Sequence, residues 1–286
     1  MSKKRIVIIG GGAAGFFSAI NISEKLKGAE LIILEKTSKL LSKVKVSGGG
    51  RCNVTHACFD PKELVKFYPR GRKELLGPFH TFMTGDTMEW FESRNVSLKI
   101  ESDNRVFPQS DSSQDIINCL TDEVNRLGIN VQTEKAVTAF KPIGDQWELS
   151  FGESTEIFDV LVVASGGNSS VIWNQLAELG YKIAPALPSL FTFNTKDTRL
   201  RDLSGLSVPN ASVKIIGSKL QETGPLLVTH WGVSGPAILK LSSVGASYLF
   251  EKQYQFQILI DWNNEISRED IQEALQIKDN RIPRRK

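Results

Sequence analysis

The sequence has 286 residues, of which 41% are hydrophobic and 23% are charged, and its formal net charge is +3. This composition is typical of a soluble globular protein with one or two domains, and so small a net charge argues against a nucleic-acid partner. No apolar run approaches the roughly 20 residues that span a bilayer, and the three cysteines form no CxxC pair, which favours a reducing, cytoplasmic setting over a disulfide framework.

The first 35 residues predict a strand, a glycine-rich turn, a helix and a second strand. Arg5–Ile9 is an apolar, β-branched run typical of a buried parallel strand, and residues 30–35 repeat the pattern. Between them, residues 10–15 read GGGAAG and are followed by a helix-like stretch that ends at Gly28. Together these segments form one expected βαβ unit.

The spacing Gly10-x-Gly12-x-x-Gly15 indicates a dinucleotide site. Gly10 allows the tight turn, Gly12 lets the backbone approach a pyrophosphate, and Gly15 lets the helix pack closely on the strand. The helix N-terminus offers N–H groups and a partial positive charge to the phosphates. Glu35, at the end of the second strand, can accept hydrogen bonds from ribose hydroxyls and disfavours the 2′-phosphate of NADP. NAD and FAD remain open at this point.

A second glycine cluster follows in the sequence KVKVSGGGRCNVT at residues 43–55. The VKV part looks like a strand, and the three glycines can expose backbone N–H groups to a ligand. Lys43 and Arg51 can supply positive charge near a phosphate. A flexible surface loop is the alternative interpretation.

Residues 112–127 have apolar positions at a helical spacing, which predicts an amphipathic helix used for packing. Ser112 or Ser113 is its expected N-cap, and Gly128 its C-cap.

A strand-rich stretch then leads to a strongly apolar strand at residues 159–163, which ends in a small-residue turn. A strand that returns to the parallel sheet through a small antiparallel layer is typical of glutathione-reductase-like FAD domains. A plain NAD-binding Rossmann domain would alternate helices and strands here, so FAD is favoured over NAD. Strands are expected within this stretch at residues 129–133, 136–141 and 147–151, and Val137 is expected where the backbone meets the adenine.

After Pro185 and Pro188 the pattern changes to short alternating strands. We expect an FAD-binding domain over residues 1–187 and an inserted, mostly β domain over residues 188–286, with the substrate cleft between them. The expected strands are residues 190–194, 211–217, 226–230 and 254–261, and a short helix is expected at residues 267–275.

Six segments, in this order, resemble the YhiN/BaiN flavoprotein family, which includes aminoacetone-oxidase-like and bile-acid-reductase-like FAD-dependent oxidoreductases. The most specific of them is SGGGRCN at residues 47–53. The resemblance implies an α/β fold, with a glutathione-reductase-like FAD-binding Rossmann domain, a small antiparallel β layer and an inserted mostly β second domain. The segments are GGGAAG at 10–15, LEK at 34–36, SGGGRCNVT at 47–55, RVFPQS at 105–110, ASGG at 164–167 and THWGVSGPAIL at 229–239.

The resemblance also implies which residues bind FAD. The first glycine loop would hold the pyrophosphate, Glu35 the ribose with Lys36 beside it, and the second glycine loop would lie against the cofactor. Ser165 stands where the family usually has threonine and keeps the hydroxyl. The implied residues are Gly10, Gly12, Ala13, Ala14, Gly15, Glu35, Lys36, Lys43, Gly48, Gly49, Gly50, Arg51, Asn53, Val137, Ser165 and Gly166.

The sequence departs from the family near its C-terminal end. Family members usually finish with a segment that returns to the FAD domain and closes over the isoalloxazine, and no such motif occurs before Lys286. We therefore expect an incomplete second domain. A truncated, non-catalytic flavin- or nucleotide-binding remnant is the alternative to an active enzyme.

The expected function is that of an FAD-dependent oxidoreductase that transfers hydride between flavin N5 and a small or medium organic substrate. NAD(P)H or O2 would be the other redox partner, and amine oxidation and reduction of an activated carbon–carbon double bond both remain open. No catalytic residue is assigned and no metal is expected, because the flavin carries the redox chemistry. An RNA-modifying flavoprotein is a third hypothesis, which the small net charge and the lack of a basic stripe with stacking aromatics disfavour.

Two further residues carry reactive groups. His230, next to Trp231, can move protons, but a structural role in a turn is favoured. Cys52, next to Arg51, can have a lowered pKa, but a small, buried and inert side chain is favoured. The expected partner is thus a small molecule, with no nucleic acid and no membrane, and the oligomeric state is left open.

Overall fold

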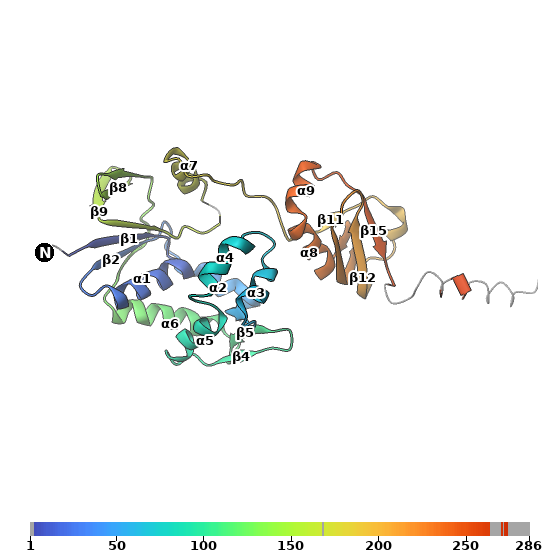
Figure 1. Cartoon of the computed structure of the whole chain (residues 1–286), viewed down its shortest axis with the longest axis horizontal. Helices are drawn as coiled ribbons and strands as arrows, with labels where there is room; N and C mark the ends of the chain where they lie inside the picture. Colours follow the sequence, from blue (N-terminus) through green and yellow to red (C-terminus); the bar gives the residue numbers. More distant parts are fainter. Residues whose placement is uncertain (1–2, 168, 264–269, 271, 274–286) are drawn as a thin grey trace, which may run out of the picture. The chain divides into compact units, whose positions relative to one another are not determined.

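The computed structural model describes residues 3–167, 169–263, 270 and 272–273 (Figure 1). The chain divides into two compact units, unit 1 over Met1–Ala184 and unit 2 over Pro185–Lys286. The predicted domain limits and the incompleteness of the second domain stay predictions. No helix in the described part of the chain is long and apolar enough to cross a membrane.

A four-stranded parallel sheet lies at the centre of unit 1, with the strand order β10–β1–β2–β6. Because β1 lies between β2 and β10, the chain winds away from β1 in both directions. The strands are β1 (Arg5–Ile9), β2 (Glu30–Leu34), β6 (Asn130–Gln132) and β10 (Val160–Val163), and helix α1 (Ala13–Lys25) joins β1 to β2. The predicted βαβ unit and the predicted returning strand are confirmed.

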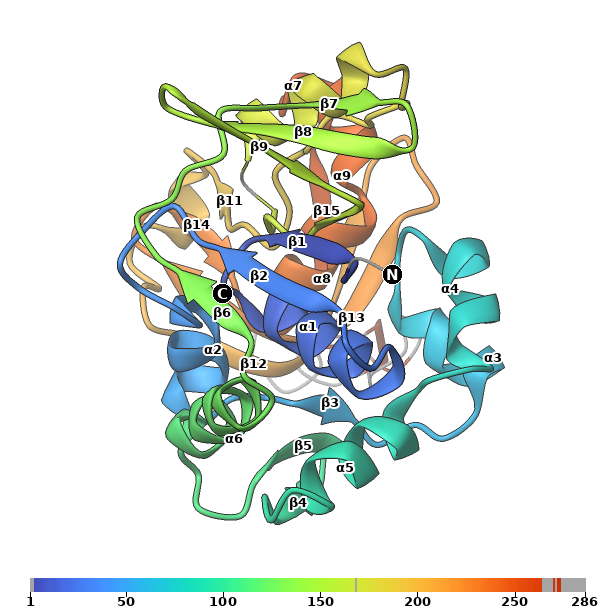
Figure 2. The same ribbon diagram turned by 90° about the vertical axis from the view of Figure 1, so that its left-hand side faces the viewer.

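Each face of this sheet is covered by a different layer. Ile6 and Ile8 pack against α1 and α6 (Ser113–Arg126), whereas Val7 and Ile9 pack against a small antiparallel sheet. The small sheet has the order β7–β8–β9 and lies on the opposite side of β1 and β2 from α1 (Figure 2). Its strands are β7 (Ala139–Ile143), β8 (Gln146–Phe151) and β9 (Ser154–Phe158), and α7 (Ser170–Glu178) packs beside them. Burial on both faces explains why β1 is a continuous apolar run.

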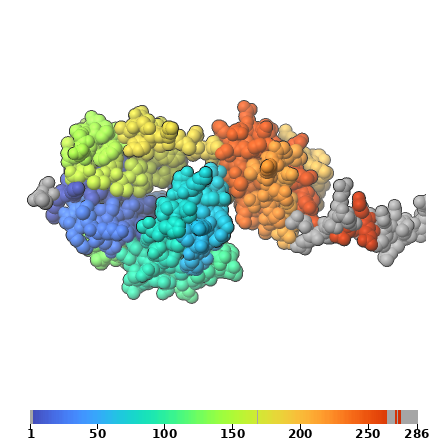
Figure 3. All heavy atoms as spheres, in the orientation of Figure 1, coloured from blue at the N-terminus to red at the C-terminus, as the bar shows by residue number. Residues whose placement is uncertain are grey.

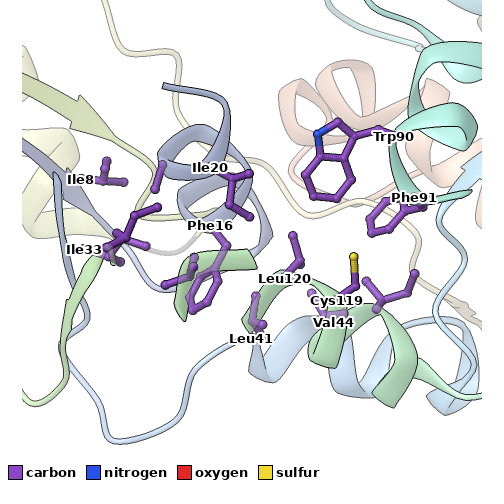
Figure 4. Packing of buried hydrophobic residues seen from close by; sticks show 14 of the residues in the cluster. Ile8, Phe16, Ile20, Ile33, Leu41, Val44, Trp90, Phe91, Cys119 and Leu120 are labelled. Carbon is purple, nitrogen blue, oxygen red and sulfur yellow. The ribbon is translucent and has the colours of Figure 1, made fainter. Parts of the chain in front are cut away.

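The core between the sheet and the helices brings together residues from distant parts of the sequence (Figure 4). Phe16 and Ile20 of α1 lie between Ile33 of β2 and Leu120 of α6, and all four are at most 2% exposed. Trp90 extends this core toward the segment that precedes α6.

The segment between β2 and α6 forms a lobe of short elements, drawn in cyan and teal in Figure 3. It contains a three-stranded antiparallel sheet with the order β3–β5–β4. Its elements are α2 (Ser42–Val46), the 3₁₀ helix η1 (Ser47–Gly50), β3 (Thr55–His56), α3 (Pro61–Leu64), η2 (Val65–Phe67), α4 (Arg72–Phe79), α5 (Thr84–Glu92), β4 (Leu98–Ile100) and β5 (Arg105–Pro108).

Two sequence predictions in unit 1 need correction. The strand expected at residues 44–46 is wrong, because these residues belong to helix α2. Val44 is buried and Val46 is 71% exposed, whereas residues two apart in a strand would share one face. In addition, β7 begins at Ala139, so Val137 precedes the strand in which it was expected. The helix predicted at residues 112–127 is confirmed, with the Ser112 hydroxyl accepting from the Gln114 N–H.

Unit 2 is a five-stranded antiparallel sheet with two helices packed on it. The strand order is β11–β14–β13–β12–β15, and Ile238 and Leu241 of α8 fill the core above the sheet. The elements are β11 (Phe193–Asn194), η3 (Thr198–Leu200), β12 (Ser207–Ile215), β13 (Gln221–Thr229), β14 (Gly232–Ser234), α8 (Pro236–Val244), α9 (Ala246–Glu251) and β15 (Ile258–Asp261). The prediction that this part of the chain consists mostly of β-strands is confirmed. Most of the helix predicted at residues 267–275 lies outside the described residues.

Candidate functional site

Three of the predicted segments meet at the carboxyl edge of the parallel sheet. The Gly10 N–H donates to the Leu34 carbonyl at 2.8 Å, and the Leu41 N–H donates to the Gly11 carbonyl at 2.9 Å. The Ala164 N–H donates to the Ile9 carbonyl at 2.8 Å. The turns after β1, β2 and β10 are therefore neighbours at the point where the strand order reverses, which is where open α/β sheets bind ligands.

Gly10 and Gly15 are required by the packing of this turn. Gly10 has φ +118°, and a Cβ on it would lie 2.3 Å from the Ala164 carbonyl oxygen. A Cβ on Gly15 would lie 1.9 Å from the Gly10 carbonyl oxygen, so only glycine allows α1 to start this close to β1. Gly12 differs from both, because a Cβ there meets no described atom within 4 Å. The space in front of Gly12 is thus open for a ligand to approach the backbone.

The N-terminus of α1 faces this open space. Gly12 is its N-cap, Ala13 and Ala14 are exposed, and within the described residues no side chain caps the helix and no acidic residue lies in its first turn. The first N–H groups of a helix lack partners inside the helix, and the helix dipole gives this end a partial positive charge. This end of α1 can therefore bind a phosphate.

The Glu35 carboxylate is held at the end of β2. One oxygen, Oε2, accepts from the Gly11 N–H at 2.9 Å, and Oε1 accepts from both the N–H and the hydroxyl of Thr37 at 2.9 Å. A carboxylate has about four lone-pair sites, so it can still accept a hydroxyl proton. Thr37 is a positioning partner that the sequence analysis missed.

Lys43 lies close to the turn after β10. Its amine nitrogen is 3.6 Å from the position that a Cβ on Gly166 would take, and Ser165 lies against Gly10 in the same turn. Lys43 is exposed, and its amine makes no ion pair with any residue that the structure describes. It therefore brings an available positive charge to the glycine turns. Lys36 is also exposed, after the end of β2.

The triglycine run, Gly48–Gly50, adopts a left-handed conformation throughout. The φ angles of its three residues are +55°, +69° and +88°, and Cys52 follows with +61°. A Cβ on Gly48 would also lie 2.8 Å from the Asn53 nitrogen. Three consecutive glycines are thus required by conformation, because L side chains rarely adopt such angles.

Arg51, which the sequence predicts to supply positive charge near a phosphate, makes ion pairs with two carboxylates in this structure. Its guanidinium lies 2.6 Å from one Glu101 oxygen and 3.0 Å from Asp111, and stacks 3.9 Å from the centre of the Phe107 ring. The Glu101 hydrogen bond is the main cause that raises the pKa of Arg51, and Arg51 in turn holds the pKa of Glu101 below its usual value. The charge of Arg51 is therefore already compensated. Glu101, Phe107 and Asp111 were missed because nothing in a linear motif marks them as its partners.

Other predicted residues lie near these elements without a demonstrated contact to a ligand. Val137 is half-buried against the core of the antiparallel layer. Asn53 follows the triglycine run and faces the Thr55 carbonyl with its side-chain amide. Cys52 is buried, and burial raises the pKa of its thiol, which agrees with the interpretation of Cys52 as inert. Binding of FAD by these and the other predicted residues stays a prediction.

His230 belongs to unit 2, in the turn between β13 and β14. It is exposed, and its ring lies 4.0 Å from the Trp231 ring in an edge-to-face arrangement. The structural role that the sequence analysis favoured for His230 stays a prediction.

Taken residue by residue, the edge of the parallel sheet fits the ADP half of FAD. It offers an uncapped helix N-terminus, an open approach at Gly12, a fixed carboxylate at Glu35 and the amine of Lys43. These are the groups that a pyrophosphate and a ribose require.

Comparison with known proteins agrees with this arrangement. The model of the HI0933-like protein Rossmann domain matches residues 4–188, and that of the HI0933-like protein barrel and H2TH domain matches residues 187–286. The 3-dehydro-bile acid delta(4,6)-reductase of Clostridium scindens is 24% identical over 279 residues, which are 94% of this chain and 67% of the relative.

Two other relatives carry a different name. The ribosomal RNA dihydrouridine synthases of Escherichia coli and Haemophilus influenzae are 27% and 28% identical over 253 and 250 residues. These alignments cover 85% and 83% of this chain and 61% and 60% of the relatives, so the chain spans about two thirds or less of the length of all three. With both family models matched along its length, the chain belongs to the HI0933-like family of YhiN/BaiN-type FAD-dependent oxidoreductases.

Proposed function

We propose that this chain forms the flavin-binding part of a reductase that acts on a carbon–carbon double bond. The observation that carries the proposal is the meeting of the turns after β1, β2 and β10 around the open backbone at Gly12. When bound there, FAD supplies hydride transfer at N5. In this proposal NAD(P)H provides a hydride, and the double bond takes up one hydride and one proton. O2 accepts electrons, so it would be the redox partner only if the substrate were an amine that is oxidised.

The names of the relatives favour a double bond over an amine as the substrate group. The bile acid enzyme is a delta(4,6)-reductase, and dihydrouridine is uridine with two added hydrogens. In both products a double bond next to a carbonyl has been reduced, although one substrate is a small molecule and the other is RNA. The small or medium organic molecule expected from the sequence is the first candidate.

In the proposed site, the residues of this chain bind and orient the cofactor. The α1 N-terminus and Lys43 compensate the negative charge of the pyrophosphate, and Glu35 accepts from the ribose hydroxyls. Thr37 and the Gly11 N–H keep the Glu35 carboxylate in place for this contact. No proton donor for the substrate is assigned.

A uridine in RNA is the second candidate substrate, contrary to the expectation of no nucleic-acid partner. Besides the two synthases, the lobe between β2 and α6 exposes aromatic side chains among cations, a combination that single-stranded nucleic acids bind. The exposed aromatic residues are Phe59, Phe67, Tyr68 and Phe82, and the neighbouring cations include Lys62, Arg72 and Lys73.

One experiment separates the candidates. The chain is loaded with FAD and given NADH or NADPH with a conjugated steroid enone, a primary amine, or undermodified ribosomal RNA, and products are identified by mass. A gain of two hydrogens on the enone supports the first candidate, and the same gain on uridine supports the second. Oxidation of the amine alone contradicts the proposal, and bound FAD without any product supports the non-catalytic alternative.

A cytoplasmic location is part of the proposal. All three cysteines, Cys52, Cys58 and Cys119, are free thiols in the structure, which suits a reducing compartment.

A further inference from the structure

We propose that Arg51, Glu101 and Phe107 form a clamp that fixes the triglycine run, so that these three residues position the flavin-binding loop without touching the phosphate. Arg51 lies directly after the run, and Glu101 and Phe107 belong to the β4–β5 hairpin. The inference rests on the proposed function, since it assigns a role in binding FAD.

The geometry of Arg51 ties the loop to the hairpin through two kinds of contact. The guanidinium makes a two-pronged hydrogen bond to Glu101, at 2.6 and 3.3 Å, and its central carbon lies over the Phe107 ring, 3.9 Å from the ring centre. Paired bonds of this kind fix direction as well as distance. Phe107 is fully buried, and the edge of its ring is 3.0 Å from the position of a Cβ on Gly48. The same ring therefore contacts both ends of the loop.

The conformation of the loop needs such support. Cys52 has a left-handed φ of +61° although it carries a side chain, and the glycines before it are the residues with most freedom to leave their native angles. Arg51 lies between Gly50 and Cys52, and its φ of −91° is in the right-handed region that side chains normally adopt. Its side chain is thus the natural anchor point of the segment.

The charges around Arg51 leave no excess for a phosphate. Three cations (Arg51, Lys99 and Arg105) lie among three carboxylates (Glu101, Asp103 and Asp111), and each cation pairs with at least one carboxylate. The cluster is therefore electrically balanced. Lys43 differs, because it makes no ion pair among the residues that the structure describes.

Glu101→Gln tests the clamp, because the two possible roles of Arg51 predict opposite results. If Arg51 served as a phosphate ligand, removing the Glu101 charge would free it and strengthen FAD binding. The clamp predicts weaker binding, by about fivefold, as expected for the loss of a partly exposed charged pair. Asp103→Asn is the matched control, because it removes a charge from the same hairpin. Among the described residues, the Asp103 carboxylate bonds only to Arg105. This substitution should therefore leave the dissociation constant of FAD unchanged.

A second measurement needs no cofactor. Hydrogen exchange of the amides of residues 48–53 in the ligand-free chain should be faster in Glu101→Gln than in the wild type and in Asp103→Asn. Unchanged or tighter FAD binding by Glu101→Gln, or equal exchange in all three proteins, would overturn the clamp. If the wild type itself binds no FAD, the proposed function fails as well, and the exchange rates still decide whether the loop is held by the clamp.

Discussion

At the scale of single residues, pairing decides which predicted cations remain available to a phosphate. Lys43 and Arg51 look equivalent in the sequence, as two basic residues at either end of a glycine cluster. The structure separates them, because Arg51 bonds to Glu101 and Asp111, which lie 50 and 60 positions away, whereas Lys43 reaches the turn at Gly166. Such distant partners could not be predicted from the sequence, since no local pattern links them.

The Arg51–Glu101 pair makes a prediction about pH. The hydrogen bond from Arg51 lowers the pKa of Glu101 in the folded chain below the unfolded value of about 4.3. A group with a lowered folded pKa contributes stability above its unfolded pKa and loses it as the pH falls through the folded pKa. The difference in melting temperature between the wild type and Glu101→Gln should therefore be constant from about pH 5 to pH 8 and shrink below about pH 4. A difference that grows on acidification would contradict this assignment.

At the scale of elements, the βαβ unit was predictable because local physical requirements coincide there. An apolar run, a turn that needs glycine and a helix with one apolar face each leave a pattern within a few residues. Helix α2 shows where prediction from a local pattern fails. The alternation in KVKV resembles a strand, but these residues form a helix whose Val44 packs in the core of unit 1. Tertiary packing overrides local propensity in so short an element.

The glycine turn provides a matched pair of substitutions. Gly15→Ala should destabilise the chain by about 1–3 kcal/mol, because the new Cβ overlaps the Gly10 carbonyl oxygen. Gly12→Ala should cost less than about 1 kcal/mol of unfolding free energy. Its Cβ meets no described atom within 4 Å, so the cost comes only from replacing glycine at the N-cap of α1. Urea unfolding followed by circular dichroism measures both. Equal destabilisation by the two substitutions would show that the turn does not have this geometry.

At the scale of the whole molecule, the chain consists of two units with separate cores. The change to short alternating strands after Pro185 and Pro188 was predictable from the sequence, because prolines and alternating strands are local signals. No local sequence pattern indicates which face of unit 2 lies toward a substrate, because that depends on how the two units assemble.

The connection between the units makes a prediction for proteolysis. Residues 181–189 form no helix or strand and are largely exposed, and Lys182 lies among them. Brief digestion with trypsin should therefore cut first after Lys182 and leave a stable fragment of unit 1, identified by mass spectrometry. A first cut inside unit 1, for example after Lys25 at the end of α1, would contradict the division into two units.

The central claim is that the turn after β1 binds FAD, and the visible absorption spectrum of the purified chain tests it most directly. The wild type should carry or take up FAD in a one-to-one ratio, with the released cofactor identified by mass. Gly12→Val should fold with the same circular dichroism but remain colourless, because its side chain fills the space in front of the pyrophosphate-binding backbone. A colourless wild type that takes up no added FAD, or a Gly12→Val variant that binds FAD as tightly as the wild type, would contradict the account.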